Sequence, residues 1–295
     1  MFSYIEILRP LNCLMSIVAV VIGGFLILNG INLAVVLVLI SVFLITGAGN
    51  VVNDYVDVEA DKINRPKRPI PSGRMSKRSA LVYCIILFVV GILLTLFVNW
   101  LTFVIAMVNS LVLVIYSTHL QHKMFVGNAA VAYLTASTFL FGGAAALGDA
   151  SFKMLSLPLL LMVLSGLSTF SREIAKDIED VEGDKIAFLK RIKSGTKSLE
   201  RFDTKDSSLK HSKGANYLAI AALILTLIVS PLPYLLNILG LAYLIVLIPT
   251  DLGFAFAIYL LVSRGGKKKY RKSQKAIKFS MFLGLIAFVA GVLFK

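Results

Sequence analysis

The sequence predicts an all-α polytopic membrane protein. Of its 295 residues, 58% are hydrophobic and only 16% are charged, and its mean hydropathy is +0.85. A soluble domain of this length carries far less apolar sequence. A helix needs about 20 mainly apolar residues to cross a bilayer core of about 30 Å. Nine stretches meet this requirement: about 11–29, 33–53, 80–98, 100–118, 125–147, 154–174, 215–235, 237–262 and 276–294.

The positions of lysine and arginine predict how these spans are oriented. With nine spans, the N-terminus and every second loop lie on one side of the membrane. Only two of the 30 Lys and Arg residues, Lys153 and Lys295, fall on the other side. Because cytoplasmic loops carry the excess of Lys and Arg, we expect a multi-pass protein of the cell membrane with a cytoplasmic N-terminus. This topology explains the net charge of +14 without a nucleic-acid partner.

Three further features have simple interpretations. The apolar run after Arg9 lacks a small-residue cleavage site, so it is interpreted as the first span and not as a cleaved signal peptide. Cys13 and Cys84 fall in or near spans and form no CxxC, so we expect them to be packing residues. The basic run 267–272 has no acidic neighbours, and we expect it to anchor the chain at lipid headgroups.

Two acidic motifs with the same spacing follow the second and sixth spans. Their carboxylates are Asp54, Asp57 and Asp61 in the first motif and Asp177, Asp180 and Asp184 in the second. Positions i, i+3 and i+7 share one face of a helix, so each motif is expected to form a stripe at the cytoplasmic end of a helix. Like charges at this spacing repel each other. Two such stripes on one membrane face therefore favour bound Mg2+, which prefers oxygen ligands, over two solvated helix ends.

Basic residues accompany both motifs. Arg65, Lys67 and Arg68 follow the first motif, and Arg172 and Lys176 precede the second. An arginine side chain can bind two phosphate oxygens at once, and lysine adds a point charge. We therefore expect a diphosphate to be held between the two motifs. Contact of these cations with anionic headgroups is the alternative.

The residues around the aspartates resemble the two signatures of the UbiA-type intramembrane prenyltransferases. The first signature reads Asn53-Asp54-x-x-Asp57-x-x-x-Asp61 and continues through Arg65-Pro66-x-Arg68-Pro69. The second reads Lys176-Asp177-x-x-Asp180-x-Glu182-Gly183-Asp184. The resemblance covers nearly the whole chain, and motifs of this length are specific.

The resemblance implies a single integral membrane domain over residues 1–295, with Asp-rich loops at about 54–78 and 175–213. It implies nine helices around a central cavity that opens sideways to lipid, with Mg2+ as cofactor and a prenyl diphosphate as donor. The residues it assigns to the metal are Asn53, Asp54, Asp57, Asp61, Asp177, Asp180 and Asp184. The catalytic role falls on Asp54, Asp57, Asp177 and Asp180. The residues expected to bind substrate are Asn12, Asn53, Arg65, Arg68, Tyr116, Lys123, Arg172 and Lys176.

Some of these positions allow a second interpretation. Asn12 matches a polar position near the diphosphate, but a hydrogen bond between helices would also explain it. Relatives carry a lysine soon after the tyrosine that ends the fourth helix, whereas here Lys123 follows Tyr116 in a different register. After Asp184, relatives continue with a short glycine–threonine–leucine–proline element, and this chain has a longer basic stretch, residues 185–213.

The acceptor is predicted from the finer pattern of the motifs. NRPxRPIPSGR together with REIxKDIEDVEGDK most resembles the archaeal digeranylgeranylglyceryl phosphate synthases. Their acceptor is a lipid-like glycerol phosphate, and Arg74, Lys77 and Arg78 are cations available for its phosphate. An aromatic quinone precursor such as 4-hydroxybenzoate is the alternative.

A transporter is the alternative from another class. Asp251 lies in the eighth span beside Pro249, and an intramembrane carboxylate is a functional candidate, although a hydrogen bond near the proline would also explain it. Against transport, the acidic motifs lie at one membrane face. The GGAAALG stretch, residues 142–148, is expected to serve close helix packing.

Overall fold

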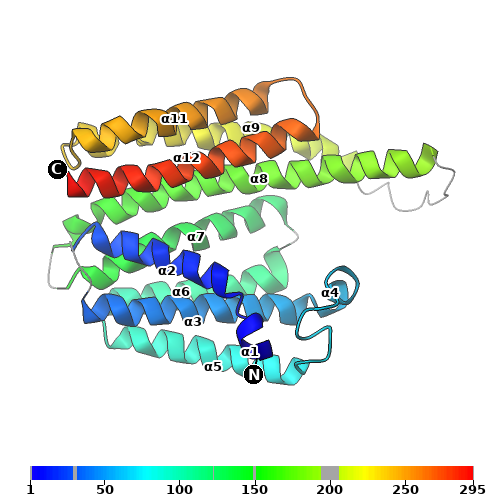
Figure 1. Ribbon diagram of the computed structural model, residues 1–295, viewed down its shortest axis with the longest axis horizontal. Helices are drawn as coiled ribbons and strands as arrows, with labels where there is room; N and C mark the ends of the chain where they lie inside the picture. Colours follow the sequence, from blue (N-terminus) through cyan, green and yellow to red (C-terminus); the bar gives the residue numbers. More distant parts are fainter. Residues whose placement is uncertain (1, 29–31, 122, 149–150, 194–205, 295) are drawn as a thin grey trace. The chain divides into compact units, whose positions relative to one another are not determined.

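A computed structural model describes residues 2–28, 32–121, 123–148, 151–193 and 206–294, without the side chains of residues 64, 181–193 and 206–213 (Figure 1). The described residues form helices and connections, with no strand. The helices are α1 (Phe2–Glu6), α2 (Pro10–Phe25), α3 (Leu33–Val56), α4 (Val58–Asn64), α5 (Lys77–Leu96), α6 (Trp100–Ile115), η1 (Tyr116–Leu120), α7 (Met124–Ala146), η2 (Phe152–Leu155), α8 (Ser156–Lys193), α9 (Asp206–Val229), α10 (Leu232–Leu235), α11 (Leu241–Val262) and α12 (Lys267–Leu293).

The helices confirm the prediction of an all-α membrane protein. Eight helical segments in the described part of the chain are long and apolar enough to cross a membrane. The shorter apolar helix α2 corresponds to the first predicted span, and it contains 16 residues. Three helices run well past their predicted ends: α8 continues to Lys193, α9 already begins at Asp206, and α12 already begins at Lys267. Lys, Arg and Glu favour helix, so the charged ends of these spans continue the helix beyond the apolar stretch.

Side-chain caps determine where several helices begin. The side-chain oxygen of Asn32 accepts a hydrogen bond from the backbone N–H of Val35 at 2.9 Å, at the start of α3. Asn99 caps α6 in the same way through Thr102 N–H, which agrees with the predicted boundary between the spans 80–98 and 100–118. Such caps satisfy N–H groups that a helix leaves without a partner in its first turn.

The chain forms two compact units. Unit 1 contains residues 1–123 and 133–163, and unit 2 contains residues 124–132 and 164–295. The long helices α7 and α8 each contribute to both units.

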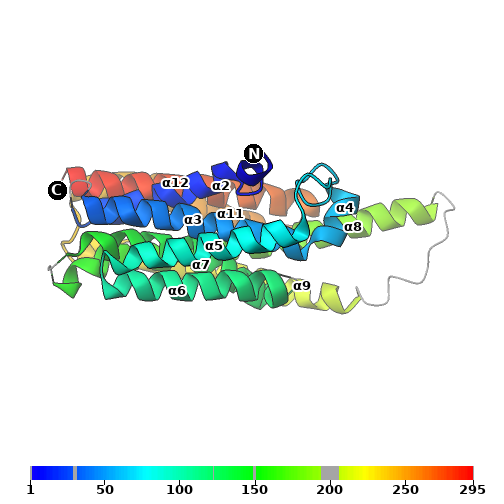
Figure 2. The same cartoon turned by 90° about the horizontal axis from the view of Figure 1, so that it is seen from below.

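Small residues let the helices of unit 1 approach each other closely. A Cβ atom added at Gly142 on α7 would lie 2.0 Å from the carbonyl oxygen of Val20 on α2, and one at Gly23 would lie 1.9 Å from that of Phe139. The GGAAALG stretch therefore contributes to helix packing, as predicted. Helix α3 lies beside α5 (Figure 2), and the Ser41 hydroxyl on α3 donates to the Gly91 carbonyl at 2.7 Å.

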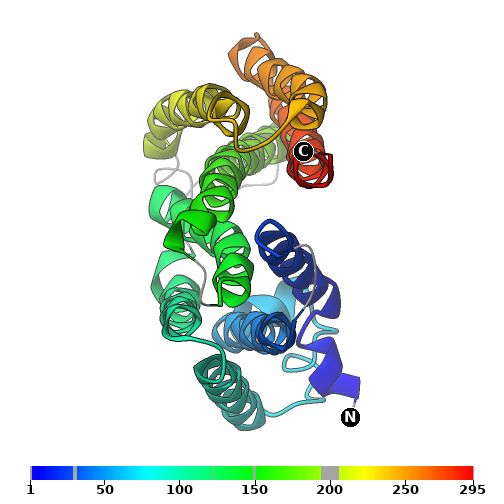
Figure 3. The same cartoon turned by 90° about the vertical axis from the view of Figure 1, so that its left-hand side faces the viewer.

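Unit 2 contains the antiparallel pair α11 and α12, which lie side by side in Figure 3. A Cβ atom at Gly291 on α12 would lie 2.8 Å from the Cβ atom of Tyr243 on α11. The Tyr243 hydroxyl donates to the carbonyl oxygen of Ser230 at 2.5 Å, and the Ser230 hydroxyl donates to Asp251 at 2.9 Å. Asp251 thus has the hydrogen bond expected of a carboxyl near Pro249, which lies inside α11.

Candidate functional site

The first aspartate motif crosses a junction between two helices. Helix α3 ends at Val56, and α4 begins at Val58. Asp57 lies between them with φ −84° and ψ 9°. Its N–H still bonds to the Asn53 carbonyl at 3.0 Å, and its own carbonyl accepts from Asp61 N–H at 2.8 Å. The prediction of one continuous helical stripe is therefore wrong in this motif, because the helix changes direction at Asp57.

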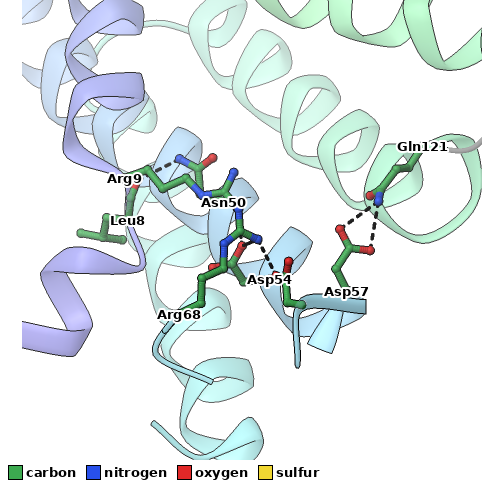
Figure 4. A network of polar contacts seen from close by, with 8 residues as sticks. Leu8, Arg9, Asn50, Asp54, Asp57, Arg68 and Gln121 are labelled. Carbon is green, nitrogen blue, oxygen red and sulfur yellow. Dashed lines mark hydrogen bonds and ion pairs between the residues drawn. The ribbon is translucent and has the colours of Figure 1, made fainter. Parts of the chain in front are cut away.

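Two arginines bind the buried carboxylates of this motif (Figure 4). Arg9 and Arg68 both donate to Oδ1 of Asp54, and the Arg68 distance is 3.0 Å. Arg68 also donates to Oδ2 of Asp61, so its guanidinium bridges the two aspartates. The side chains of Asp54 and Asp61 are only 3% and 8% exposed. Carboxylates buried this deeply need positive partners, and the two arginines supply them.

The turn between α1 and α2 brings Arg9 to this site. Arg9 adopts the left-handed conformation, with φ 50° and ψ 70°, directly before Pro10. The preceding carbonyl, that of Leu8, accepts a hydrogen bond at 2.8 Å from the side-chain amide of Asn50 on α3 (Figure 4). A non-glycine residue with positive φ is strained, and such strain persists where surrounding contacts fix it. The Asn50 contact and the Asp54 ion pair both fix this turn.

A neutral amide binds Asp57, the remaining aspartate of this motif. The Gln121 side chain donates to both carboxylate oxygens of Asp57, at 3.0 and 2.8 Å (Figure 4). Gln121 follows η1, a π-helical turn that begins at Tyr116, and its N–H bonds to the Tyr116 carbonyl at 2.9 Å. Single π-helical turns often mark functional sites. Lys123, two residues further on, has an exposed side chain.

The basic loop after α4 has mixed roles. Arg65 is exposed, whereas Arg74 donates to both carboxylate oxygens of Glu6 on α1, at 2.6 and 3.0 Å. This hydrogen bonding lowers the pKa of Glu6 below its ordinary value. The Lys77 ammonium lies 4.6 Å from the ring centre of Tyr55. Of the three cations proposed for an acceptor phosphate, Arg74 and Lys77 thus have partners within the protein, and Arg78 is exposed.

The second motif lies inside the continuous helix α8. The side-chain amide of Asn128, on α7, donates to Oδ2 of Asp177 at 2.8 Å. Asp180 is exposed, and the side chain of Asp184 lies outside the described residues. Asp177 and Asp180, three residues apart on α8, share one helical face, as the spacing predicts. The expectation for residues 185–213 also falls on residues whose side chains, or whose whole placement, are not described.

Glu173 organises the basic residues that precede this motif. Arg172 donates to one carboxylate oxygen of Glu173, and the Lys176 ammonium lies 3.5 Å from the other. The Glu173 carboxylate is buried, with 12% of its side chain exposed. The spacing of Glu173 and Lys176, three residues apart on a helix, is a sequence signal for this pair that the motif analysis missed.

The polar groups at both motifs fit Mg2+. Asn53 Oδ1 is enclosed and has no hydrogen-bond partner among the described residues, so it is free to bind a cation. Asp57 and Asp177 are held by neutral amides, which orient a carboxylate without cancelling its charge. In the described part of the chain, no group of three or more His, Cys, Asp or Glu side chains already forms a metal site. In the first motif, Asp54 and Asp61 are bound by arginines instead.

Sequence reasoning identified the acidic residues but missed most of their partners. Arg9, Gln121, Asn128 and Glu173 were not predicted as site residues. Glu173 lies within the second motif itself, whereas Gln121 acts across a distance of 64 residues in the chain. Asn12 is exposed and makes no hydrogen bond to another helix among the described residues. The structure therefore does not support the alternative that Asn12 serves as a hydrogen bond between helices.

Comparison with known proteins identifies relatives over the full chain. The family model described as the UbiA prenyltransferase family matches residues 14–286. The digeranylgeranylglyceryl phosphate synthase of Methanococcoides burtonii is 42% identical over 301 residues, which cover 99% of this chain and 100% of the relative. The enzyme of the same name from Methanosarcina mazei is 40% identical and covers 98% of each chain.

Solved structures show the same fold. A structure of a digeranylgeranylglyceryl phosphate synthase in membranes superposes with a TM-score of 0.85 at 36% identity, covering 99% of this chain and 98% of that one. A UbiA homologue from Archaeoglobus fulgidus bound to GPP and Mg2+ superposes with a TM-score of 0.56 at 15% identity, covering 97% and 99%. At this identity, the second structure supports the fold alone.

Proposed function

Because the chain belongs to the UbiA prenyltransferase family, we propose that it forms the second ether bond of an archaeal membrane lipid. It transfers a geranylgeranyl group from geranylgeranyl diphosphate to the free hydroxyl of geranylgeranylglyceryl phosphate. The observation that carries this proposal is the full-length similarity, at about 40% identity, to proteins named digeranylgeranylglyceryl phosphate synthase.

The reaction exchanges one bond to carbon for another. The bond between C1 of the prenyl chain and the diphosphate oxygen breaks, and its electron pair leaves with the diphosphate. The acceptor hydroxyl oxygen forms the new bond to C1 and loses its proton to solvent. Developing negative charge on the leaving group is the main electrostatic demand of this reaction.

The two aspartate motifs are suited to that demand. Mg2+, when bound by oxygen ligands of this kind, neutralises diphosphate charge and stabilises the leaving group. The proposed ligands are Asn53, Asp54, Asp57, Asp61, Asp177, Asp180 and Asp184. The enclosed Oδ1 of Asn53 supports this assignment in the first motif, and the amide that orients Asp177 supports it in the second.

The basic residues around the motifs complete the proposed substrate site. Arg65 and Lys123 have exposed side chains that can reach a phosphate. Arg68 binds two aspartates, and we propose that it turns to the diphosphate once metal neutralises them. Arg172, Lys176, Tyr116 and Asn12 are the other proposed substrate contacts. The apolar helices would surround the prenyl tail and keep water away from the cationic carbon.

We also propose that both motifs and the N-terminus face the cytoplasm. The bias of Lys and Arg to one side of the predicted spans supports this orientation. The donor and the metal ion are polar, and a site at this face gives them access from the aqueous compartment.

The acceptor is tested by product analysis with the purified protein. Geranylgeranyl diphosphate and Mg2+ are supplied with either geranylgeranylglyceryl phosphate or 4-hydroxybenzoate, and the products are identified by mass. We expect digeranylgeranylglyceryl phosphate and released diphosphate, both lost in EDTA. If only 4-hydroxybenzoate is prenylated, the acceptor is an aromatic quinone precursor and not the glycerol phosphate lipid. If neither product forms and the protein conducts a solute in liposomes, a transporter would be favoured.

A further inference from the structure

A basic cleft of about 230 Å³ lies between α8 and α12 in unit 2. Four of its lining side chains are cationic, one is an amide and one is acidic: Arg172, Arg271, Lys275, Lys278, Gln274 and Glu179. Of the cleft-lining residues of α12, Arg271 belongs to the basic run 267–272 that was interpreted above as a headgroup anchor, and the others belong to no sequence motif. Their concentration of positive charge against a single carboxylate indicates a site for an anion.

The spacing of these residues explains why they meet. Arg271, Lys275 and Lys278 occupy positions i, i+4 and i+7 of α12, so they share one face of that helix. Arg172 and Glu179 are seven residues apart on α8, which is about two turns. The Gln274 amide donates to Glu179 Oε2 at 2.8 Å and joins the two helices at the cleft.

The cations of the cleft have few anionic partners in the protein. Glu179 is bound by the neutral amide of Gln274. Among the described side chains, Arg271, Lys275 and Lys278 form no ion pair. Arg172 is paired with Glu173, but its Nε atom is enclosed and lacks a hydrogen-bond partner. Like charges gathered on one helix face repel each other, and a bound anion would remove that cost.

The cleft differs from the proposed metal site by its place around α8. A helix turns by about 100° per residue. Asp177, five residues after Arg172, therefore lies about 140° away from it around the helix, whereas Asp180, eight residues after it, lies about 80° away. All of these residues nevertheless lie within about two turns along the helix axis. The cleft thus lies beside the second aspartate motif at the same level of α8, and Arg172, proposed above as a substrate contact, is one of its lining residues.

We propose that this cleft binds the phosphate group of the acceptor lipid, a proposal that rests on the proposed function. The acceptor is a phosphomonoester, which carries about −1.5 to −2 charges at neutral pH, whereas the diester phosphates of bulk membrane lipids carry about −1. Four cations and one carboxylate suit the more highly charged group. Arginine forks and the Gln274 amide are suitable donors for its three terminal oxygens.

The test separates binding of the acceptor from chemistry. The Arg271→Gln/Lys275→Gln variant is compared with Lys268→Gln/Lys272→Gln, which removes the same charge at the same spacing on α12 but outside the cleft. Rates are measured against acceptor concentration at saturating donor, in nanodiscs of neutral lipid. Equilibrium binding of radiolabelled geranylgeranylglyceryl phosphate is measured without donor.

We expect the acceptor KM and Kd of the cleft variant to rise about tenfold or more, since charge-assisted hydrogen bonds to phosphate are lost. Its kcat and donor KM stay within about twofold of the wild type, as do all constants of the control. The charge-preserving variant Lys275→Arg retains the wild-type acceptor KM. Because the substituted side chains are exposed, we expect the thermal unfolding of all three variants to match that of the wild type.

Three outcomes would overturn the proposal. If the wild type forms product and the cleft variant keeps its acceptor KM and Kd, the subsite is wrong although the proposed function stands. If the cleft variant loses only a stimulation by added phosphatidylglycerol, the cleft binds bulk diester lipid. If the wild type neither binds nor prenylates geranylgeranylglyceryl phosphate, the proposed function fails and the subsite fails with it.

Discussion

Arg68 connects two buried aspartates, so its replacement gives a sharp test of the first motif. In the Arg68→Gln variant, Asp61 loses its arginine and Asp54 keeps only Arg9. The Arg68 side chain is 16% exposed, and those of Asp54 and Asp61 are 3% and 8% exposed. At this burial, solvent cannot replace the lost partner.

The expected cost follows from that burial. Removing one partner of a buried ion pair destabilises a protein by about 3–5 kcal/mol, because the other charge stays buried. Arg9 still compensates Asp54, so we expect the lower end, about 3 kcal/mol. If Asp61→Asn is introduced as well, the uncompensated charge disappears. The double variant should then be less destabilised than the sum of the single variants, by about 1–3 kcal/mol.

Thermal unfolding in detergent, with and without Mg2+, measures this effect without relying on turnover. Lys67→Gln is the matched control, because Lys67 is an exposed cation in the same loop. We expect Arg68→Gln to lower the melting temperature clearly and the control to leave it unchanged. Mg2+ should stabilise Arg68→Gln more than the wild type, since a divalent cation can replace the guanidinium. Equal melting temperatures for Arg68→Gln and Lys67→Gln would refute the reasoning.

Two further predictions concern the second motif and the topology. Asp177→Asn should keep the fold but require a higher Mg2+ concentration for half-maximal prenyl transfer. An unchanged Mg2+ requirement would show that the second motif is only a solvated helix end. In a background without Cys13 and Cys84, a membrane-impermeant thiol reagent added to intact cells should label Ser151→Cys but not Ser263→Cys. Labelling of Ser263→Cys from outside would reverse the proposed orientation.

The sequence was sufficient to predict the fold because a membrane span is a local property. About 20 consecutive apolar residues define a span whatever they pack against. The predicted spans match the helices, and the largest differences are extensions at their charged ends, as in α8 and α12. Two apolar ends also differ: α9 ends at Val229, before the predicted 235, and α11 begins at Leu241, after the predicted 237. The charged ends could not be predicted from hydropathy, because a charged helix can continue into water beyond the apolar core. The short turn between α5 and α6 was predictable, since Asn99 is a strong helix cap.

The site residues were predictable only where they lie close to one another in the amino-acid sequence. The aspartates lie three or four residues apart, so their pattern is visible in the chain. Their partners are distant: Arg9 is 45 residues from Asp54, and Asn128 is 49 residues from Asp177. No spacing rule links such pairs, because tertiary packing brings them together. The break of the helix at Asp57 was missed for a related reason, since no Gly or Pro marks it in the sequence.

The chemistry of these partners divides the aspartates into two groups. Asp54 and Asp61 are bound by arginines, so their charges are compensated within the protein. Asp57 and Asp177 are hydrogen-bonded by the neutral amides of Gln121 and Asn128, which orient the carboxylates without an ion pair. A cation arriving at the first motif would therefore meet Asp57 and the enclosed oxygen of Asn53 first, and would have to displace Arg68 to gain Asp54 and Asp61. If a cation binds there as proposed, the Arg68 guanidinium would be released from the two aspartates and would be free to turn toward a phosphate.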